Sequence, residues 1–561
     1  MPSSTENNKQ TLLDWFHYWE LTQPQSVYLT QPNGHQVTDY TWAEVGDQAR
    51  RMAAHLRSLK LAPRSSIGLL SKNCAHWFIA DLAIWMAGHV TVPFYPTLNA
   101  DTARHILEHA EVKLLFIGKL EKADWDAVRS AIPDELAQIA LPLAGSLGEV
   151  PRWDDITAKT RPIKSAARRK PEELATIIYT SGSTGKPKGV MMSFGAMLRC
   201  AEGARSIVEP TPEDRMISYL PLAHAAERAV VEAPSLRGGT RVYFADTLST
   251  FLDDLRRARP TLFLSVPRLW TKFYLGIQQK LPLKRQKVLF RTPVVGGIVK
   301  RKLLHELGLD YVRYALTGAA PLPPHILEWY REIGLELIEG YGMSENFAYS
   351  HANRTGSVKV GTVGQPMPGV HCRIADNGEI LVKSPCNMMG YYHDEARTRE
   401  AIDADGWLHT GDRGEIDDKG RLRITGRVKE LFKTSKGKYV APAPIENRLM
   451  RHPRIEAVCV AGAGRPQPFA LLMLSADAQA ATANAADRGV LERELSELLD
   501  EVNAELEPHE VLDFVAVVKE QWTIENGFLT PTLKIKRDVI EGRYDPQVED
   551  WASRRRKVVW A

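Results

Sequence analysis

The chain has 561 residues, of which 44% are apolar and 25% are charged, close to the averages of folded globular proteins. These values exclude a disordered, collagen-like or coiled-coil chain, and at about 150 residues per domain the length predicts three to four domains. The formal net charge, 72 − 68 = +4, is too small to indicate a nucleic-acid partner.

The cysteines and the apolar stretches indicate the compartment. Five cysteines are scattered and never spaced as CxxC: Cys74, Cys200, Cys372, Cys386 and Cys459. This argues against a disulfide framework or a zinc ribbon and predicts a reducing compartment. The first ten residues are polar, and the most apolar stretch, 77–95, contains Asp81, whereas a membrane span needs about 20 residues with few or no charges. We expect a cytoplasmic protein.

Along the first half of the chain, short apolar runs alternate with helical patterns. Strands are predicted at 65–71, 89–96, 112–118, 174–180, 215–222, 241–246, 261–267 and 311–318, and helices at 74–88, 100–111 and 323–334. This alternation is typical of βαβ units with parallel sheets.

The pattern changes after about residue 355. Gly and Pro become dense, and short strands are predicted at 370–375, 378–384 and 420–426, which indicates a small β-rich subdomain. Beyond residue 426 we expect strands at 457–464, 469–475 and 514–518 and one helix at 489–506, with Leu491, Leu495 and Leu499 on one face. The Ala-rich segment 476–486 is interpreted as a surface connection. We place a domain boundary at 426–430.

The strongest local signal is Tyr179-Thr-Ser-Gly-Ser-Thr-Gly-Lys-Pro-Lys-Gly189, directly after a predicted strand. Hydroxyl, backbone N–H and ammonium donors on a glycine-containing loop suit a polyphosphate. The loop is not a Walker motif, because Pro187 follows Lys186 where that motif has Ser or Thr.

Further motifs follow in chain order. They are Tyr219-Leu-Pro-Leu-Ala-His-Ala-Ala-Glu-Arg228, Thr317-Gly-Ala-Ala-Pro-Leu322, Glu339-Gly-Tyr-Gly-Met-Ser-Glu345, Gly406-Trp-Leu-His-Thr-Gly-Asp412, Gly426-Arg-Val-Lys-Glu430, Lys436-Gly-Lys-Tyr-Val-Ala-Pro442 and Leu529-Thr-Pro-Thr-Leu-Lys-Ile-Lys-Arg537. Together with the phosphate loop, they resemble the signature motifs of the adenylate-forming superfamily. The motifs Tyr219–Arg228 and Leu529–Arg537 have the form found in long-chain fatty acyl-CoA synthetases. The resemblance to the superfamily runs from about residue 40 to residue 540.

The resemblance implies an α/β fold. It has a large N-terminal domain of layered α/β units, residues 1–426, with a β-rich subdomain at about 355–426. A smaller, mobile α+β domain, residues 427–561, carries the catalytic lysine. The implied reaction is ATP-dependent activation of a medium- to long-chain fatty acid, with ATP and CoA as co-substrates and Mg²⁺ as cofactor.

The resemblance also implies the nucleotide contacts. Glu345 would hold Mg²⁺ together with Thr184, Tyr341 would stack on adenine, and Asp412 would accept the ribose hydroxyls beside Arg427. The remaining ATP or AMP contacts are expected from Thr180, Ser181, Gly182, Ser183, Gly185, Lys186, Lys188, Gly318, Ala319, Ala320, Glu339, Gly340, Gly342, Met343 and Ser344.

Other roles concern catalysis and the acyl group. Lys534 would contact the α-phosphate and the acyl carboxylate, and His224 would lie near that carboxylate. Lys429 sits at the interdomain hinge. Lys433, Ser435, Lys436, Gly437 and Lys438 would face CoA, and Trp270 is a candidate for the acyl tunnel or, equally, a core tryptophan.

Several alternatives stay open. The nearest is an acyl-AMP ligase that loads a carrier protein, or a ligase for an aryl or other carboxylate. An inactive acyl-lipid-binding or scaffold homologue is a different class. His105-Ile-Leu-Glu-His109 matches a zinc-protease pattern, but no third ligand is evident and an ordinary amphipathic helix explains it. The basic C-terminus, Arg554–Lys557, is explained by a solvated chain end; peripheral contact with an anionic inner membrane face is kept as an alternative, and a homodimer is left open.

Overall fold

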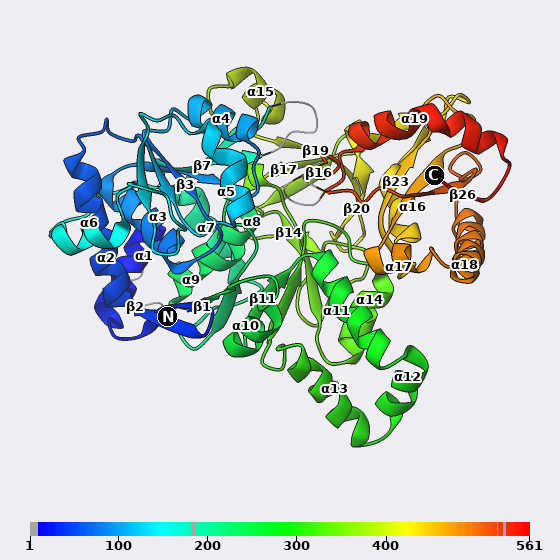
Figure 1. The fold of residues 1–561 in the computed structure, drawn as a ribbon, viewed down its shortest axis with the longest axis horizontal. Helices are drawn as coiled ribbons and strands as arrows, with labels where there is room; N and C mark the ends of the chain where they lie inside the picture. Colours follow the sequence, from blue (N-terminus) through cyan, green and yellow to red (C-terminus); the bar gives the residue numbers. More distant parts are fainter. Residues whose placement is uncertain (1–8, 181–185, 524–525, 531–533) are drawn as a thin grey trace. The chain divides into compact units, whose positions relative to one another are not determined.

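The computed structural model describes residues 9–180, 186–523, 526–530 and 534–561. Two compact units make up the fold (Figure 1). The first, N-terminal unit is formed by the chain up to Ala320 with residues 326–372 and 382–409. The second, C-terminal unit is formed by residues 410–561 with two short pieces, 321–325 and 373–381.

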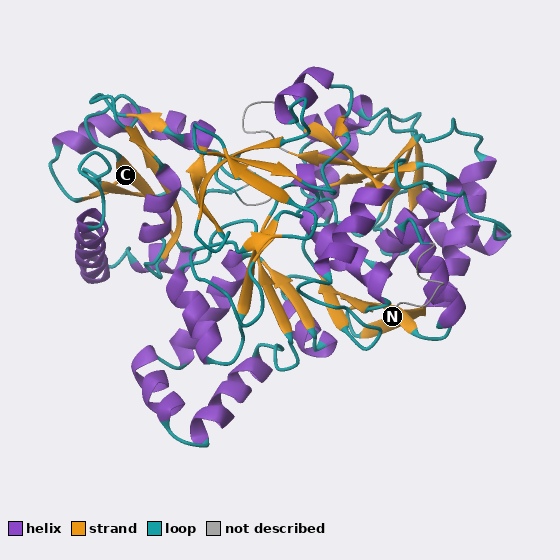
Figure 2. Cartoon of the chain, turned by 180° about the vertical axis from the view of Figure 1, so that it is seen from behind, coloured by secondary structure: helices purple, strands orange, loops and turns teal. Residues whose placement is uncertain are grey.

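Three sheets organise the N-terminal unit (Figure 2). A seven-stranded sheet has the order β18 (Gly390–Tyr391), β8 (Lys188–Ser193), β7 (Leu174–Thr180), β4 (Val90–Phe94), β3 (Ser66–Leu70), β5 (Leu114–Ile117) and β6 (Ala137–Ala140). A five-stranded sheet has the order β11 (Leu262–Ser265), β12 (Tyr314–Thr317), β13 (Leu337–Tyr341), β14 (His351–Ala352) and β15 (Gln365–Pro366). A four-stranded sheet has the order β2 (Gln36–Thr41), β1 (Val27–Asn33), β10 (Arg241–Phe244) and β9 (Arg215–Ser218).

Helices follow the strands as the alternation predicts. They are α1 (Leu12–Thr22), α2 (Trp42–Ser58), α3 (Ala75–Ala87), α4 (Ala100–His109), α5 (Lys122–Val128), α6 (Trp153–Lys159), α7 (Phe194–Ala204), α8 (Ala225–Glu227), α9 (Ala233–Gly238), α10 (Phe251–Ala258), α11 (Pro267–Lys280), α12 (Leu283–Arg291), α13 (Val295–Glu306), α14 (Pro324–Glu332) and α15 (Glu395–Ala401). Among the described residues, no helix combines the length and apolar character needed to cross a bilayer.

The seven-stranded sheet is buried on both faces. Leu115 and Ile117 of β5 pack in one cluster with Ile106 and Leu107 of α4. On the opposite face, the indole of Trp85 in α3 donates to the carbonyl of Ala175 in β7. Because β3, β4, β5 and β7 run parallel, their carboxyl ends share one edge, where ligands bind in open α/β sheets.

A fully buried ion cluster lies between α3, this sheet and the turn of π-helix at Arg228–Glu232, which joins α8 to α9. The guanidinium of Arg228 donates to Asp81, to Glu232 at 2.6 Å and to the hydroxyl of Thr176 at 2.8 Å. Each of these charged side chains is at most 2% exposed. The cluster satisfies buried charges with paired, hydrogen-bonded partners.

The C-terminal unit contains most of a further four-stranded sheet and a separate α+β layer. The sheet has the order β16 (His371–Ile374), β17 (Glu379–Lys383), β19 (Leu408–Ile416) and β20 (Leu422–Arg427). A small hairpin, β21 (Phe432–Lys433) and β22 (Tyr439–Val440), precedes the layer of β23 (Ile455–Ala461), β24 (Phe469–Leu474), β25 (Val515–Val518) and β26 (Val558–Trp560). The helices are α16 (Pro442–Leu449), α17 (Ala476–Ala481), α18 (Ala485–Ala504) and α19 (Arg537–Ser553).

The predicted helical face is confirmed, because Leu491, Leu495 and Leu499 of α18 are buried in the core of this unit. The segment 476–486 lies on the surface as interpreted, and it is largely helical, since Ala476–Ala481 form α17 and Ala485 begins α18. Alanine has the highest helix propensity, and the Ser475 hydroxyl caps α17 by accepting from the N–H of Ala478.

Candidate functional site

The phosphate motif connects two antiparallel strands. Thr180, the last residue of β7, pairs with Lys188, the first residue of β8. The predicted contacts Ser181, Gly182, Ser183, Thr184 and Gly185 lie outside the described residues, and Lys186 is exposed. The Thr180 hydroxyl is buried and has no hydrogen-bond partner in the part of the chain that the structure describes. A buried hydroxyl without a partner next to this loop suits a polar ligand.

Lys188 and Glu345, which are far apart in sequence, meet at the start of β8. The Lys188 ammonium lies 3.2 Å from Glu345 Oε1, and the carboxylate is largely buried. Tyr391 of β18 completes the group, because its hydroxyl donates to Glu345 Oε1 at 2.8 Å and Lys188 Nζ lies 4.1 Å from its ring centre. Burial, then the Glu345 charge, raise the pKa of Tyr391, which stays a neutral donor. We call Lys188, Glu345 and Tyr391 the Lys–Glu–Tyr group.

The motifs ending β12 and β13 lie side by side, because these strands pair in parallel. A Cβ on Gly318 would come within 3.1 Å of the Gly340 carbonyl oxygen, so the segment Gly318–Ala320 runs close beside Gly340–Tyr341. Glu339 is largely buried, and Tyr341 is partly exposed.

The segment between Tyr341 and Glu345 turns sharply. A Cβ on Gly342 would meet the Ala348 carbonyl carbon at 2.4 Å, so glycine is required there. The N–H of Met343 donates to the side chain of Asn346, and Ser344 begins the single helical turn Ser344–Asn346. This turn delivers the Glu345 carboxylate to Lys188.

His224 and Trp270 have structural contacts of their own. His224 Nδ1 accepts from the N–H of Ala226 at 3.0 Å and caps α8. Trp270, near the start of α11, is fully buried, and its indole N–H donates to the Leu316 carbonyl at 3.3 Å. These contacts fit the capping and core interpretations and leave a role toward the acyl group as a prediction.

In the C-terminal unit, Asp412 and Arg427 face each other across β19 and β20. The guanidinium of Arg427 donates to Asp412 Oδ1 at 2.9 Å. Lys429 follows in a short helical turn, Val428–Glu430, and is exposed. The two motifs therefore form one structural feature, a strand pair that leads directly into the predicted hinge.

The predicted CoA-facing residues form the hairpin of β21 and β22. Gly437 has φ +78°, a left-handed conformation that glycine adopts without strain, and its N–H donates to the Thr434 carbonyl. The N–H of Ser435 donates to the Arg465 carbonyl, and Lys436 Nζ bonds Gln467 Oε1 at 3.0 Å. Lys433 and Lys438 complete the hairpin.

Two hydrogen bonds join Lys534 to Thr530. The N–H of Lys534 donates to the Thr530 hydroxyl at 3.1 Å, the N–H of Thr530 donates to the Lys534 carbonyl, and the lysine side chain is exposed. Three residues later, the largely buried guanidinium of Arg537 bonds Glu446 Oε1 at 2.8 Å and the Val460 carbonyl at 2.8 Å. Arg537 thus attaches the lysine segment to α16 and β23.

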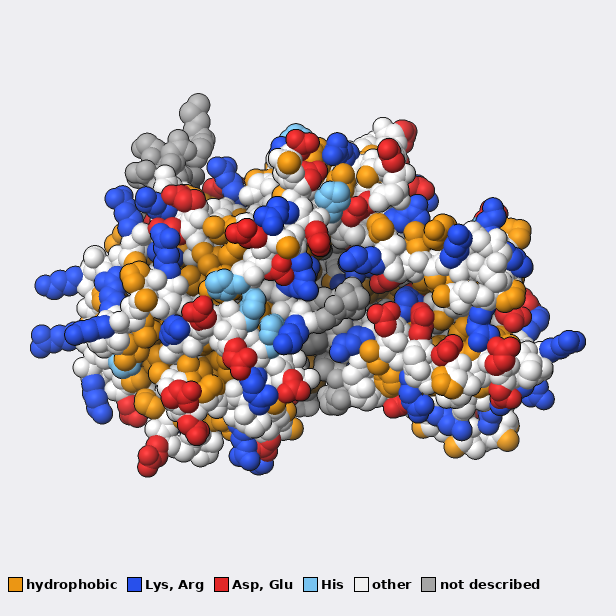
Figure 3. Space-filling model, turned by 90° about the horizontal axis from the view of Figure 1, so that it is seen from above, with side chains coloured by type: hydrophobic (Ala, Val, Ile, Leu, Met, Phe, Trp, Pro, Cys, Tyr) orange, Lys and Arg blue, Asp and Glu red, His pale blue; other side chains and the backbone are white. Residues whose placement is uncertain are grey.

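Sequence reasoning did not find the role of the HILEH segment. His105 Nε2 lies 2.9 Å from the Pro187 carbonyl, and His109 Nδ1 lies 2.7 Å from the Tyr179 hydroxyl. Two histidines one turn apart on α4 therefore contact both ends of the phosphate motif. Figure 3 shows histidine side chains gathered on the face seen from above. No group of three or more metal-ligating side chains occurs among the described residues.

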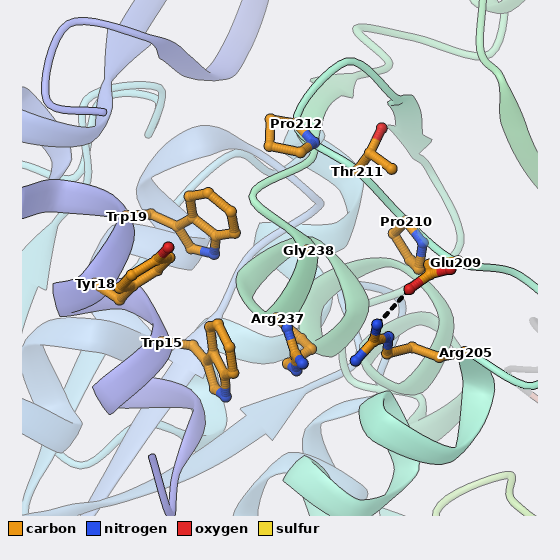
Figure 4. Close-up of a pocket in the computed structure, with 10 residues that line it drawn as sticks. All are labelled: Trp15, Tyr18, Trp19, Arg205, Glu209, Pro210, Thr211, Pro212, Arg237 and Gly238. Carbon is orange, nitrogen blue, oxygen red and sulfur yellow. Dashed lines mark hydrogen bonds and ion pairs between the residues drawn. The ribbon is translucent and has the colours of Figure 1, made fainter. Parts of the chain in front are cut away.

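A small, partly open pocket in the described part of the chain is lined by α1 and by residues 205–212 and 237–238 (Figure 4). It has a volume of about 150 Å³, and α1 supplies its aromatic wall, Trp15, Tyr18 and Trp19. Arg237 stacks on Trp15 with 3.6 Å between guanidinium carbon and ring centre. None of the predicted site residues lines this cavity.

Comparison with known proteins identifies the family. The profile of the AMP-binding enzymes matches residues 16–392, and that of the AMP-binding enzyme C-terminal domain matches residues 430–555. The chain belongs to the AMP-binding enzyme family. Among curated members of this family, it is 32% identical to long-chain-fatty-acid–CoA ligase FadD15 of Mycobacterium tuberculosis, over 91% of this chain and 92% of that protein. It is also 32% identical to human long-chain-fatty-acid–CoA ligase 1, over 88% of this chain and 79% of that protein.

Solved structures of AMP-binding enzymes share the fold. The anthranilate CoA ligase AuaEII in complex with anthranoyl-AMP superposes with a TM-score of 0.78 at 19% identity, covering 97% of this chain and 100% of that one. The A domain of carboxylic acid reductase from Segniliparus rugosus, in complex with AMP and a co-purified carboxylic acid, superposes with a TM-score of 0.79 at 21% identity, covering 98% and 95%. The predicted α/β architecture with two unequal domains is confirmed.

Proposed function

We propose that this AMP-binding enzyme is a fatty acid–CoA ligase that prefers medium- to long-chain acids. The observation that carries the proposal is 32% identity to curated long-chain-fatty-acid–CoA ligases along nine-tenths of the chain. The Lys–Glu–Tyr group beside the phosphate motif supports it, since it offers a cation and a carboxylate at one place.

The reaction has two steps. A carboxylate oxygen of the fatty acid attacks the α-phosphorus of ATP, the bond to the β-phosphate oxygen breaks, and pyrophosphate leaves. The sulfur of CoA then attacks the acyl carbonyl carbon, AMP departs, and the thiol proton passes to solvent. The first step brings two anions together, so charge neutralisation and in-line positioning make up most of the catalysis.

In the first step, the phosphates would be held by Thr180, Lys186, Lys188 and the segment Ser181–Gly185. Lys534 would neutralise charge between the α-phosphate and the acyl carboxylate. Mg²⁺, a hard cation, would be held by Glu345 with help from Thr184, and would neutralise phosphate charge when bound.

The nucleoside would be held from two directions. Tyr341 would stack on adenine beside Gly318–Ala320 and Glu339–Ser344. Asp412 would accept both ribose hydroxyls, a task for which two carboxylate oxygens are suited, with its orientation fixed by Arg427 at 2.9 Å.

The second step would use a different face of the C-terminal domain. We propose residue 427 as the start of that domain and Lys429 as the hinge, where a few torsions absorb a domain rotation. The hairpin with Lys433, Ser435, Lys436, Gly437 and Lys438 would then face CoA. His224 would lie near the acyl carboxylate and Trp270 near the acyl chain.

The deciding experiment measures pyrophosphate and acyl-CoA by mass spectrometry, with ATP, Mg²⁺ and a series of fatty acids, with and without CoA. Lys534→Ala is expected to abolish product, since one charge in the transition state is lost. Lys536→Ala, an exposed lysine two residues away, is the matched control and should retain activity.

Each other outcome selects an alternative. Adenylate without acyl-CoA would indicate loading of a carrier protein, and product only from aryl acids would indicate another carboxylate ligase. Neither product from any acid would indicate a binding or scaffold protein and contradict the proposal.

Three further expectations stay predictions: a cytoplasmic location, a homodimer and membrane contact through the basic C-terminus. All four basic side chains of the tail are exposed; Arg554 bonds Asp550 at 2.6 Å and Lys557 bonds Asp500 at 2.7 Å, whereas Arg555 and Arg556 make no such ion pair with the described residues. Tail contact therefore depends on these two arginines, and sedimentation measures the homodimer.

A further inference from the structure

The helices α12 and α13 carry an unusual concentration of exposed aliphatic side chains. Sixteen large hydrophobic side chains are exposed in the described part of the chain, and five of them fall within 283–298: Leu283, Val288, Val294, Val295 and Ile298. Their exposed fractions range from 42% to 79%. Clustered exposed apolar side chains mark an interaction surface, whereas single ones do not.

The same segment is strongly basic. Residues 283–306, from the start of α12 to the end of α13, contain Lys284, Arg285, Lys287, Arg291, Lys300, Arg301 and Lys302 and one acid, Glu306. The formal charge is 7 − 1 = +6, while the whole chain carries +4, so the remainder of the protein carries 4 − 6 = −2. The positive charge is therefore a local property of this helix pair.

The inner side of the pair is anchored to the N-terminal unit. Gln286 is buried, accepts from the indole N–H of Trp329 in α14 at 2.7 Å and donates to the Leu281 carbonyl. Phe290 and Leu303 are also buried, and a Cβ on Gly296 would approach the Phe290 carbonyl oxygen to 2.5 Å. Figure 1 shows α12 and α13 leaving the neighbouring helices and meeting at a turn at their far end.

That turn presents a valine to solvent. The N–H of Val295 donates to the Pro293 carbonyl at 2.7 Å, and Val294 has φ +65° and ψ −53°, a γ-turn that is rare for a β-branched residue. Val294 is 79% exposed at this position.

We propose that the α12–α13 pair is a docking surface for anionic lipid membranes. Exposed Val, Leu and Ile side chains beside Lys and Arg are the composition of interfacial helices, in which the apolar groups enter the acyl boundary and the cations meet the headgroups. Single-stranded nucleic acid would instead call for aromatic stacking platforms, which the exposed side chains of this surface do not supply. A lipid partner also suits an enzyme with a long-chain acyl substrate. This point rests on the proposed function, whereas the docking proposal does not rest on it.

The test is flotation of the full-length protein with vesicles of phosphatidylcholine alone or with about 30% phosphatidylglycerol, at about 0.05 M and 0.5 M salt. Binding is expected only to the anionic vesicles and to weaken at high salt. Lys284→Ala with Lys287→Ala and Arg301→Ala should weaken binding about fivefold per cation removed. Val294→Asn with Ile298→Asn should weaken it further, because both remove apolar side chains from the surface.

Two control variants separate this surface from others. Leu248→Asn removes a still more exposed aliphatic side chain elsewhere, and Arg555→Ala with Arg556→Ala removes two exposed cations of the tail. Leu248→Asn should bind as the parent does, and the tail variant should keep most of the binding, with any loss measuring the separate contribution of the tail. In the parent, amide hydrogen exchange should slow in 283–302 when anionic vesicles are added.

The proposal would be overturned if the parent protein did not bind anionic vesicles. It would also be overturned if only the tail variant lost vesicle binding, or if the α12–α13 variants bound vesicles as tightly as the parent does. Tighter binding to single-stranded RNA than to vesicles would indicate a polyanion site instead. Because flotation needs no substrate, these outcomes do not depend on whether the protein makes acyl-CoA.

Discussion

At the scale of single residues, the most informative contacts are those of His105 and His109 on α4. They reach the carbonyl of Pro187 and the hydroxyl of Tyr179, on either side of the phosphate motif. Since a carbonyl only accepts, His105 Nε2 must carry a proton in this contact. Burial, then the neighbouring His105 and His393, lower the pKa of His109, so at neutral pH the tyrosine hydroxyl donates to its Nδ1.

His105→Ala should therefore loosen one end of the motif. We expect the KM for ATP to rise about fivefold, the equivalent of one hydrogen bond, with kcat at saturating ATP little changed. His105→Gln, which keeps an N–H donor, should recover most of the loss. Steady-state kinetics measure the KM for ATP, and Glu108→Ala, at an exposed position on the same helix, is the control. The same KM for both alanine variants would refute the prediction.

His76 governs a different residue-scale property, the response to acid. It is almost fully buried, donates through Nε2 to Gln48, and burial lowers its pKa to about 3. The ordinary value near 6.5 applies in the unfolded chain, which therefore binds the extra proton first. Stability from the neutral histidine is present above pH 6.5 and is lost as the pH falls toward 3.

Between pH 6.5 and 5 this loss should amount to about 2 kcal/mol. His76→Gln should lower stability at neutral pH and flatten the acid dependence of chemical unfolding in that range. An unchanged slope would show that another group sets the acid response.

At the scale of elements, the π-helical turn at Arg228–Glu232 is fixed by its buried ion cluster. The turn follows α8, whose cap is His224, and the cluster ties it to α3 through Asp81 and to β7 through Thr176. Glu227, one residue before the turn, accepts from the Ser218 hydroxyl and the Tyr219 N–H. These bonds fix the start of the motif Tyr219–Arg228, to which Glu227 itself belongs. Burial raises the pKa of Glu227 to about 8.

Arg228→Met should destabilise the N-terminal unit by about 3 to 5 kcal/mol, because two carboxylates would stay buried without their cation. Adding Asp81→Asn and Glu232→Gln to it should recover part of the loss. Arg104→Ala, which breaks an exposed pair with Asp101, should cost less than about 1 kcal/mol. Thermal and urea unfolding measure all three, and equal effects of Arg228→Met and Arg104→Ala would contradict the interpretation.

The order of the elements could be predicted from the sequence, because apolar runs and helical periodicity are local properties. The strand ending at Thr180 and the helix at 100–109 are where the patterns indicate. The glycines and acidic residues of the candidate site could be located because the resemblance to the adenylate-forming superfamily supplies the spacing of its motifs.

Contacts between distant segments could not be predicted. Tyr391 belongs to no motif, yet it bonds Glu345 across 46 positions and Lys188 across 203. His105 finds Pro187 only once α4 packs against the seven-stranded sheet. Hydrophobic periodicity specifies which face of a helix or strand is buried, but it does not specify which other element packs against that face.

At the scale of the whole molecule, the proposed reaction uses motifs from both units, and the proposed hinge, Lys429, lies within the second unit directly after β20. Lys429→Pro would hold φ near −65° and remove a backbone N–H. We expect this variant to change the rate of one half-reaction at least about tenfold more than the other, whereas Lys429→Ala should affect both little. Pyrophosphate release and thioester formation from preformed acyl-AMP measure the halves separately. Equal changes in both would argue against a hinge at this residue.

The Lys–Glu–Tyr group has a consequence for the order of ligand binding. The Lys188 ammonium lies against Glu345, so each charge neutralises the other. A phosphate that draws Lys188 away would leave the carboxylate with only the Tyr391 hydroxyl, and its affinity for a divalent cation would rise. By thermodynamic reciprocity, occupation of Glu345 by such a cation must raise the affinity of Lys188 for phosphate by the same factor. One lysine would thereby make two ligands cooperative.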